Sequence, residues 1–181
     1  MVKQVLFLQG GGGKEDYTAG AVLVASLQKA LGEAYVVHYP LLPDTAEPDL
    51  GRLKQIGQAL SLLKGELLVV GHSLGASMLL KYLTETPVQH QIAGVFLLAT
   101  PFWQGDEEWK QGLKLPHDFA HKLPPNVPIF LYHSQDDDEV PFTHLALYAQ
   151  ALPQATVCPI LSGGHYLNQD ASLVAKDIKA L

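Results

Sequence analysis

Residues 66–85 read ELLVVGHSLGASMLLKYLTE, an apolar run that turns into an apolar helical pattern through a short glycine-containing segment. Glu66–Val70 has the length and composition of a strand buried on both faces, and the helical pattern continues to about Glu85. Between them, Gly71 to Gly75 fits Gly-x-Ser-x-Gly with Ser73 at its centre. A strand, a tight turn and a helix in this order predict a nucleophile elbow, in which the serine hydroxyl projects beyond the strand end.

The bare pentapeptide is a weak signal because glycine and serine are common, and its position between a strand and a helix gives it weight. The alternative is an ordinary strand-to-helix turn in which Ser73 serves only as a helix N-cap. His72 is next to Ser73 in the chain, but successive side chains diverge at such a turn. We therefore expect His72 to be structural.

Strands and helices alternate along the rest of the chain. This alternation predicts a mostly parallel sheet of about six strands with helices on both faces, as one α/β domain over residues 1–181. The expected elements, besides those above, are strands at Val2–Leu8, Ala34–Tyr39, Ile92–Ala99, Ile129–His133 and Thr156–Ile160, and helices at Asp16–Leu31, Pro48–Leu63, Pro141–Leu152 and from Asp170 onward.

One irregular stretch, residues 101–127, interrupts this alternation with tryptophans, charges and prolines. A long excursion in a short chain is typical of a partial lid or a pocket-lining loop. The alternative is a helix packed on the sheet edge. Aromatic side chains here could line an acyl pocket, and Phe102 and Trp103 are the favoured candidates because they follow a predicted strand directly. Simple edge packing is the competing interpretation.

Composition limits the classes of function. The 181 residues are 48% hydrophobic and 17% charged, with a net charge of -6, which indicates a globular domain and argues against nucleic acid as a partner. The N-terminus lacks the pattern of a signal peptide and no run reaches membrane-span length, so we expect a cytoplasmic protein without a membrane partner. Cys158, the single cysteine, falls in an apolar run that predicts a buried strand and an inert thiol.

A serine nucleophile needs a base, and His165 is the candidate. It follows two glycines in a loop after the last predicted strand, at the carboxyl end of a parallel sheet, where catalytic groups gather. The base in turn needs a carboxylate to fix its tautomer. Asp136, Asp137 and Asp138 all follow the strand Ile129–His133, and position alone does not choose among them.

The order of serine, acid and histidine is that of α/β-hydrolases. The chain resembles this superfamily over essentially its whole length, and in particular its small, nearly lidless serine hydrolases such as the retinoblastoma-binding hydrolases. Members often carry Asp-x-x-Val-Pro after the acid-bearing strand, and the sequence Asp137-Asp138-Glu139-Val140-Pro141 matches it. The resemblance therefore implies Asp137 as the partner of His165, with the remaining acids solvated or capping the next helix.

Acyl transfer also needs N–H donors for the developing oxyanion. One candidate is the amide of Leu74, just after the serine. The resemblance implies that the other is the amide of Gly11, because the family often has His-Gly-x where this chain has Gln9-Gly10-Gly11. Since Gln9 departs from that pattern, Gly10 and Gly12 remain alternatives. The glycine run itself does not fit a nucleotide-binding loop.

These observations predict a serine hydrolase that cleaves small carboxylic esters, or thioesters or amides, through an acyl-enzyme on Ser73. The expected partner is a small acyl substrate. No cofactor is implied, and the scattered histidines predict no metal site. The alternative is a binding or interaction protein that keeps the fold but has little catalytic activity.

Overall fold

A single six-stranded sheet runs through the molecule in the computed structural model, which describes residues 2–181. Every neighbouring pair of strands is parallel, which confirms and sharpens the predicted mostly parallel sheet. The strand order is β2-β1-β3-β4-β5-β6, with β1 at Lys3–Leu8, β2 at Tyr35–His38, β3 at Leu67–His72, β4 at Ile92–Leu98, β5 at Ile129–Ser134 and β6 at Thr156–Ile160.

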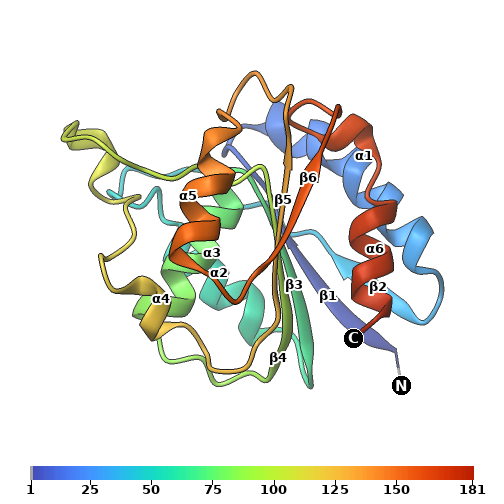
Figure 1. Ribbon diagram of the computed structural model, residues 1–181. Coiled ribbons are helices and arrows are strands. Elements are labelled where there is room, and N and C mark those ends of the chain that lie inside the picture. Colours follow the sequence, from blue (N-terminus) through green and yellow to red (C-terminus); the bar gives the residue numbers. More distant parts are fainter. Residues whose placement is uncertain (1) are drawn as a thin grey trace.

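Helices cover both faces of this sheet (Figure 1). On one face lie α1 and α6, and on the other lie α2, α3, α4 and α5. The bounds are α1 Lys14–Leu31, α2 Arg52–Ser61, α3 Leu74–Glu85, α4 Phe119–Lys122, α5 Thr143–Ala151 and α6 Ser172–Lys179, with short 3₁₀ helices at Glu108–Lys110 and Leu167–Gln169. None of the helices within residues 2–181 is long and apolar enough to cross a membrane.

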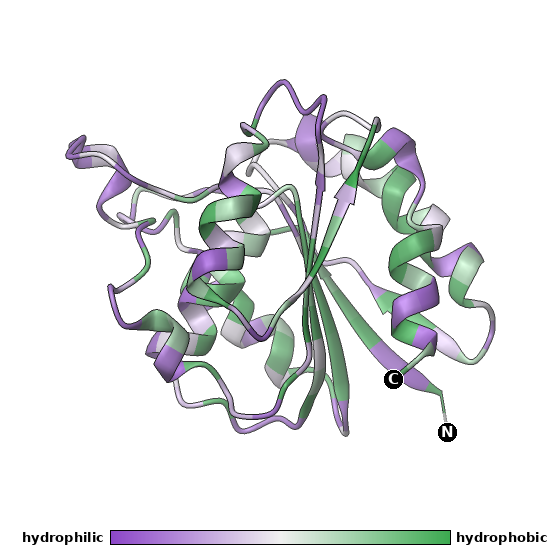
Figure 2. Cartoon of the chain, viewed as in Figure 1, coloured by the Kyte–Doolittle hydropathy of each residue, from purple (hydrophilic) through white to green (hydrophobic). Residues whose placement is uncertain are grey.

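Two hydrophobic cores result, one on each face of the sheet. Successive side chains of a strand point to opposite faces, so Leu6 and Leu8 of β1 pack with α2 and α3, whereas Val5 and Phe7 pack with α1 and α6. The strands consequently carry hydrophobic residues almost continuously, as Figure 2 shows in green between the more hydrophilic loops. Burial on both faces explains the uninterrupted apolar runs of the sequence.

The strand order reverses at β1. The chain adds β2 on one side of β1 and then crosses over to place β3 on its other side. In open parallel sheets, ligands bind beyond the carboxyl ends of the strands at such a switch point. The segment after β1 begins at Gln9 and the segment after β3 holds Ser73, so the topology brings these two segments together.

Two local expectations differ from the structure. The helix expected from Pro48 begins at Arg52, because Leu50 and Gly51 have φ angles of 57° and 73°, outside the helical region. The last strand, β6, was expected to be buried, but it is the edge of the sheet and pairs only with β5, so three of its five residues are exposed. Cys158 is accordingly half-buried, and burial together with nearby Asp177 raises the pKa of its thiol.

The excursion at residues 101–127 contains little regular structure, with one 3₁₀ turn and the four-residue α4. It projects from the side of the molecule that carries α4 and α5 (Figure 1). Its buried residues Leu113 and Phe119 join the core next to α3. The four-residue α4 packs against α3 and not on the sheet edge, while Trp103, Trp109 and Leu113 of the same segment line the cavity described next.

Candidate active site

Ser73 occupies a strained turn between β3 and α3. Its φ and ψ angles are 52° and −123°, a conformation that a non-glycine residue adopts only when its surroundings impose it. The amide of Ser73 donates to the carbonyl of Leu98 at 2.8 Å, which ties the turn to β4. Two residues on, a Cβ at Gly75 would lie 2.1 Å from the carbonyl oxygen of Gln9. Only glycine therefore lets the elbow approach the loop after β1 this closely.

His165 is buried in the loop between β6 and α6. The carboxylate of Asp136 fixes the start of that loop by accepting from the amides of Gly163 and Gly164 at 2.8 and 2.9 Å, and from the hydroxyl of Ser162 at 2.7 Å. The Ser162 hydroxyl, then the Gly164 and Gly163 amides, lower the pKa of Asp136 to about 2. Asp136 thus holds the histidine loop, a role that was not anticipated for it.

The carboxylate of Asp137 faces the His165 ring, with Nδ1 at 3.0 and 3.1 Å from its two oxygens. Its Oδ1 also accepts from the amides of Glu139 and Val140 at 3.0 and 2.9 Å. Burial by itself raises the pKa of Asp137, but the Val140 amide, His165 and the Glu139 amide outweigh it, so the pKa is lowered. An ionised carboxylate here holds the proton of His165 on Nδ1 and leaves Nε2 as the basic nitrogen.

His72 also holds the loop that carries His165, through a hydrogen bond to its main chain. Its Nε2 donates to the main-chain carbonyl of His165 at 2.8 Å, and its ring is completely buried between Gly10 and the rings of His165 and Tyr166. Burial and the proximity of His165 lower the pKa of His72 to about 4. His72 is therefore a neutral structural donor at neutral pH, in keeping with the expectation from the sequence.

Ser73 and His165 line one cavity of about 550 Å³. Ser73 is half-buried, and its hydroxyl has no hydrogen-bond partner within residues 2–181, His165 included. Nε2 of His165 lies 3.6 Å from the exposed carboxylate of Glu139. The cavity is also lined by Gly10, Gly11, Asp16, Leu50, His72, Leu74, Pro101, Trp103, Trp109, Leu113, Val140, Pro141, His144 and Tyr166.

Main-chain N–H groups are available at this cavity. The amides of Leu74, Gly10 and Gly11 donate no hydrogen bond to any residue between 2 and 181, and all of these residues line the cavity. The amide of Gly12, the other alternative from the sequence, is instead occupied by Oδ2 of Asp44 at 3.2 Å. Free N–H groups beside a reactive hydroxyl are the arrangement that stabilises an oxyanion.

Of the two aromatic residues expected to line the pocket, only Trp103 does so. Trp103 lines the cavity with Ser73, and its Nε1 donates to the hydroxyl of Ser77 at 3.0 Å. Phe102 lines only a neighbouring cavity of about 370 Å³, which Trp103 also lines, and the ring of Phe102 packs on Tyr148. The main-chain amide of Phe102 donates to Nδ1 of His144 at 2.9 Å, which links the excursion to α5.

Several lining residues had no clear signal in the sequence. Asp16 comes from the first turn of α1, Leu113 from the excursion and His144 from α5. Tyr166 and Glu139 are beside residues that the sequence did single out, so proximity in the chain could have suggested them. Among residues 2–181 there is no cluster of three or more His, Cys, Asp or Glu side chains that could hold a metal ion.

Comparison with known proteins identifies the family. A family model described as serine hydrolase matches residues 24–175, most of the chain, including Ser73, Asp137 and His165. The chain belongs to the serine hydrolase family. The matched part of this serine hydrolase begins after β1, so the family assignment does not depend on the glycine-containing segment that follows that strand.

Solved structures resemble this serine hydrolase over nearly its full length. The ydeN gene product from B. subtilis has a TM-score of 0.75 at 18% identity, with 99% of this chain and 98% of that chain covered. A thioesterase domain from the curacin biosynthetic pathway gives 0.73 at 17%, covering 99% and 92%. The esterase domain of a Rhodothermus marinus protein gives 0.67 at 18%, covering 98% and 85%.

At these identities the similarity concerns the fold alone, and it confirms the predicted α/β-hydrolase architecture. A comparison with curated protein sequences finds no match. The chain is therefore a serine hydrolase with the α/β-hydrolase fold, and the identity of its substrate has to be argued from the cavity itself.

Proposed function

We propose that this serine hydrolase cleaves small, uncharged carboxylic esters through an acyl-enzyme on Ser73. The observation that carries the proposal is the shared cavity, which Ser73 and His165 both line while the carboxylate of Asp137 lies 3.0 Å from Nδ1 of the His165 ring. Serine, histidine and aspartate in these roles form an acyl-transfer site.

The first half of the reaction forms the acyl-enzyme. Oγ of Ser73 attacks the ester carbonyl carbon as Nε2 of His165 takes the hydroxyl proton. The carbonyl electron pair moves onto oxygen, and the amides of Leu74 and Gly11, with that of Gly10 beside them, donate to the resulting oxyanion. When the carbonyl re-forms, the alcohol leaves and takes the proton from Nε2.

The second half repeats these steps with water. Nε2 of His165 takes a proton from water as the water oxygen attacks the acyl carbon, and the proton then passes to Oγ of Ser73 as the acid leaves. Asp137 remains ionised throughout and stabilises the imidazolium that forms twice. Its lowered pKa supports this role, since the carboxylate is charged over the whole neutral range.

The cavity lining favours uncharged substrates. It includes the carboxylates of Asp16 and Glu139 but no lysine or arginine, so an anionic acyl chain would meet repulsion there. Trp103, Trp109 and Leu113 supply apolar surface of the kind that an acyl chain packs against. Thioester or amide cleavage would proceed through the same acyl-enzyme, and esters are preferred over amides because resonance with nitrogen makes the amide carbonyl less open to attack.

Covalent labelling by a fluorophosphonate tests the proposal. The wild type is expected to be labelled and to hydrolyse 4-nitrophenyl esters, whereas Ser73→Ala is expected to lose both properties. Ser61→Ala, which removes an exposed hydroxyl at the end of α2, serves as the matched control and should behave as the wild type. A folded wild type that neither labels nor hydrolyses any ester in a panel of acyl lengths would favour the alternative of a binding protein.

A further inference from the structure

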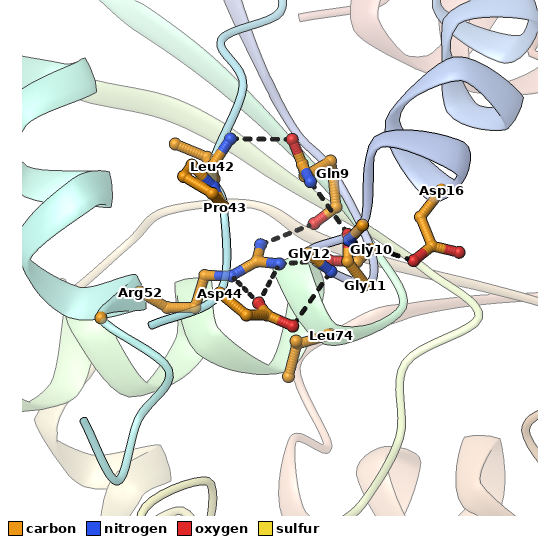
Figure 3. Close-up of polar contacts among 12 residues, drawn as sticks. Gln9, Gly10, Gly11, Gly12, Asp16, Leu42, Pro43, Asp44, Arg52 and Leu74 are labelled. Atoms are coloured by element: carbon orange, nitrogen blue, oxygen red, sulfur yellow. Dashed lines mark hydrogen bonds and ion pairs between the residues drawn. The ribbon is translucent and has the colours of Figure 1, made fainter. Parts of the chain in front are cut away.

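Arg52 is completely buried and lies outside the cavity that Ser73 lines. Its guanidinium points from the start of α2 into the segment Gln9–Gly12, here called the glycine loop (Figure 3). Nη1 donates to the carbonyl of Gln9 at 3.2 Å and Nη2 to that of Gly10 at 2.7 Å, while Nε and Nη2 donate to Oδ1 of Asp44 at 3.2 and 2.9 Å. A charge buried this deeply has to be paired, and here half of its hydrogen bonds go to the main chain of one loop.

Those two carbonyls determine where two N–H groups point. The carbonyl of Gln9 shares a peptide unit with the N–H of Gly10, and the carbonyl of Gly10 shares one with the N–H of Gly11. No peptide bond within residues 2–181 is cis, and in a trans peptide the C=O and N–H point in opposite directions. Arg52 therefore turns both N–H groups away from itself, and both glycines line the cavity.

The rest of the glycine loop is also bonded. Nε2 of Gln9 donates to the carbonyl of Gly11 at 2.9 Å, while Oε1 of the same side chain accepts from the amide of Leu42 at 2.8 Å. Oδ2 of Asp44 accepts from the amide of Gly12 at 3.2 Å (Figure 3). From the carbonyl of Gln9 to the amide of Gly12, the N–H groups of Gly10 and Gly11 are thus the only main-chain polar groups left free.

We propose that Arg52 is a positioning residue for oxyanion binding. It holds the Gln9–Gly10 and Gly10–Gly11 peptides in the orientation that presents their N–H groups to the cavity, and it polarises both peptides. A cation that donates to a carbonyl draws electron density from that peptide, which makes the N–H of the same unit a stronger donor. This role rests on the proposed function, because the oxyanion arises only in acyl transfer.

The geometry of the guanidinium explains why this position carries an arginine. Its planar fork reaches two successive carbonyls and one carboxylate at the same time, whereas the ammonium of lysine is a point charge on a flexible stem. Arg52→Lys therefore keeps the charge but loses the fixed orientation. Arg52→Met loses both and keeps a side chain of similar length. Tyr132→Phe, which removes a part-buried hydrogen bond to Asp177 in α6, serves as the control for lost stability.

The test combines steady-state kinetics on 4-nitrophenyl acetate with amide NMR spectra of the full chain. We expect kcat of Arg52→Met to fall by about 10- to 100-fold, somewhat less than the loss of an oxyanion donor itself. KM should change less than about threefold, since the ground-state ester does not depend on these donors. Arg52→Lys should fall between Met and the wild type, and Tyr132→Phe should be destabilised with kcat unchanged.

NMR supplies a readout that does not depend on turnover. In Arg52→Met the amide resonances of Gly10 and Gly11 should move, and those of the elbow after β3 should move much less. If both glycine resonances stay in place, or if kcat is unaffected, the proposal is wrong. If they move but the wild type hydrolyses no ester, the proposed function fails and the orienting role of Arg52 stands.

A second variant keeps the test valid if Arg52→Met does not fold. Asp44→Asn removes the carboxylate that anchors the guanidinium and leaves Arg52 in place. It should shift the same two amides and lower kcat in the same direction by a smaller factor. An unchanged kcat in a folded Asp44→Asn with displaced glycine resonances would also overturn the link between loop orientation and catalysis.

Discussion

The glycine loop and the Asp137–His165 pair flank β3 in the sheet order, and they are built in opposite ways. In the glycine loop the free groups at the cavity belong to the main chain, and side chains hold them in place. In the pair the group at the cavity is a side chain, that of His165. The carboxylate of Asp137 holds it, and the main-chain amides of Glu139 and Val140 in turn bind Asp137. The main chain therefore supplies the free polar groups in the glycine loop, whereas in the pair it supplies the hydrogen bonds that hold a side chain in place.

The two regions also differ in the sequence separation between their polar groups and the residues that hydrogen-bond to them. The amides that bind Asp137 come from the following three residues, so the acid turn is nearly self-contained. The carbonyls of the glycine loop are held by Arg52, which is more than 40 residues away and depends on the docking of α2. We therefore expect mutation to affect the two regions differently. The Asp137–His165 pair should be sensitive to replacement of its own side chains, whereas the glycine loop should be sensitive to changes in the residues packed against it.

The largest expected effect is the loss of the charge on Asp137. Asp137→Asn keeps an oxygen that can accept from the amides of Glu139 and Val140, so the turn should persist while His165 loses its anionic partner. We expect kcat on 4-nitrophenyl acetate to fall by about 10³- to 10⁴-fold, with thermal stability little changed. Asp138→Asn, at the exposed neighbouring position, is the control. A kcat within tenfold of the wild type would exclude this carboxylate as the orienting group.

The side-chain groups of the site could be predicted from the sequence better than its main-chain groups. Where side chains do the chemistry, residue types mark the position, so Ser73 and His165 could be proposed from local patterns. Asp137 could be chosen among its acidic neighbours only through the family resemblance, and the structure places it against His165. The regular alternation of strands and helices likewise predicted all six strands and the two-sided core.

Where the main chain does the chemistry, the sequence was less informative. Every residue except proline carries the same N–H, so glycines alone could not decide among Gly10, Gly11 and Gly12, and the bond from Gly12 to Asp44 became visible only in three dimensions. Arg52 gave no signal because an arginine near a helix start is normally solvated. Phe102 and Trp103 are adjacent and both line the smaller cavity, but only Trp103 also lines the cavity with Ser73, which spacing could not resolve.

His72 joins the two regions, and its titration should affect both. Imidazole in an unfolded chain titrates near 6.5, whereas burial, with repulsion from His165, lowers the pKa of His72 to about 4. The unfolded chain therefore binds this proton more readily than the folded one. Its contribution to stability is complete above pH 6.5 and is lost as the pH falls through 4.

The measurement is urea unfolding of the wild type and His72→Gln between pH 8 and pH 4. The wild type should lose on the order of 3 kcal/mol more of its unfolding free energy than the variant over this range. Glutamine has an N–H that can donate to the carbonyl of His165, so the variant should fold at pH 8. Parallel curves for the two proteins would show that His72 does not titrate in this window.

The smallest expected effect concerns the contact between the glycine loop and the elbow. A Cβ at Gly10 would lie 3.2 Å from the Cβ of Ser73 and 3.2 Å from Nδ1 of His72, closer than most such contacts, so both neighbours would have to yield by a few tenths of an ångström. Gly10→Ala should lower kcat by about 10- to 100-fold, because small displacements of a reacting group carry large costs in rate.

Gly13→Ala is the matched control for this substitution. Its Cβ would meet only the end of the exposed Asp16 side chain, at 3.1 Å, and that side chain can move away, so kcat should stay within about twofold of the wild type. Comparing the two variants tests whether activity depends on the close approach of Gly10 to Ser73 or on the number of glycines in residues 10–13. Equal losses of activity in the two would favour loop flexibility over the close packing of Gly10 on the elbow, and would weaken the view that Arg52 and Asp44 fix a single conformation.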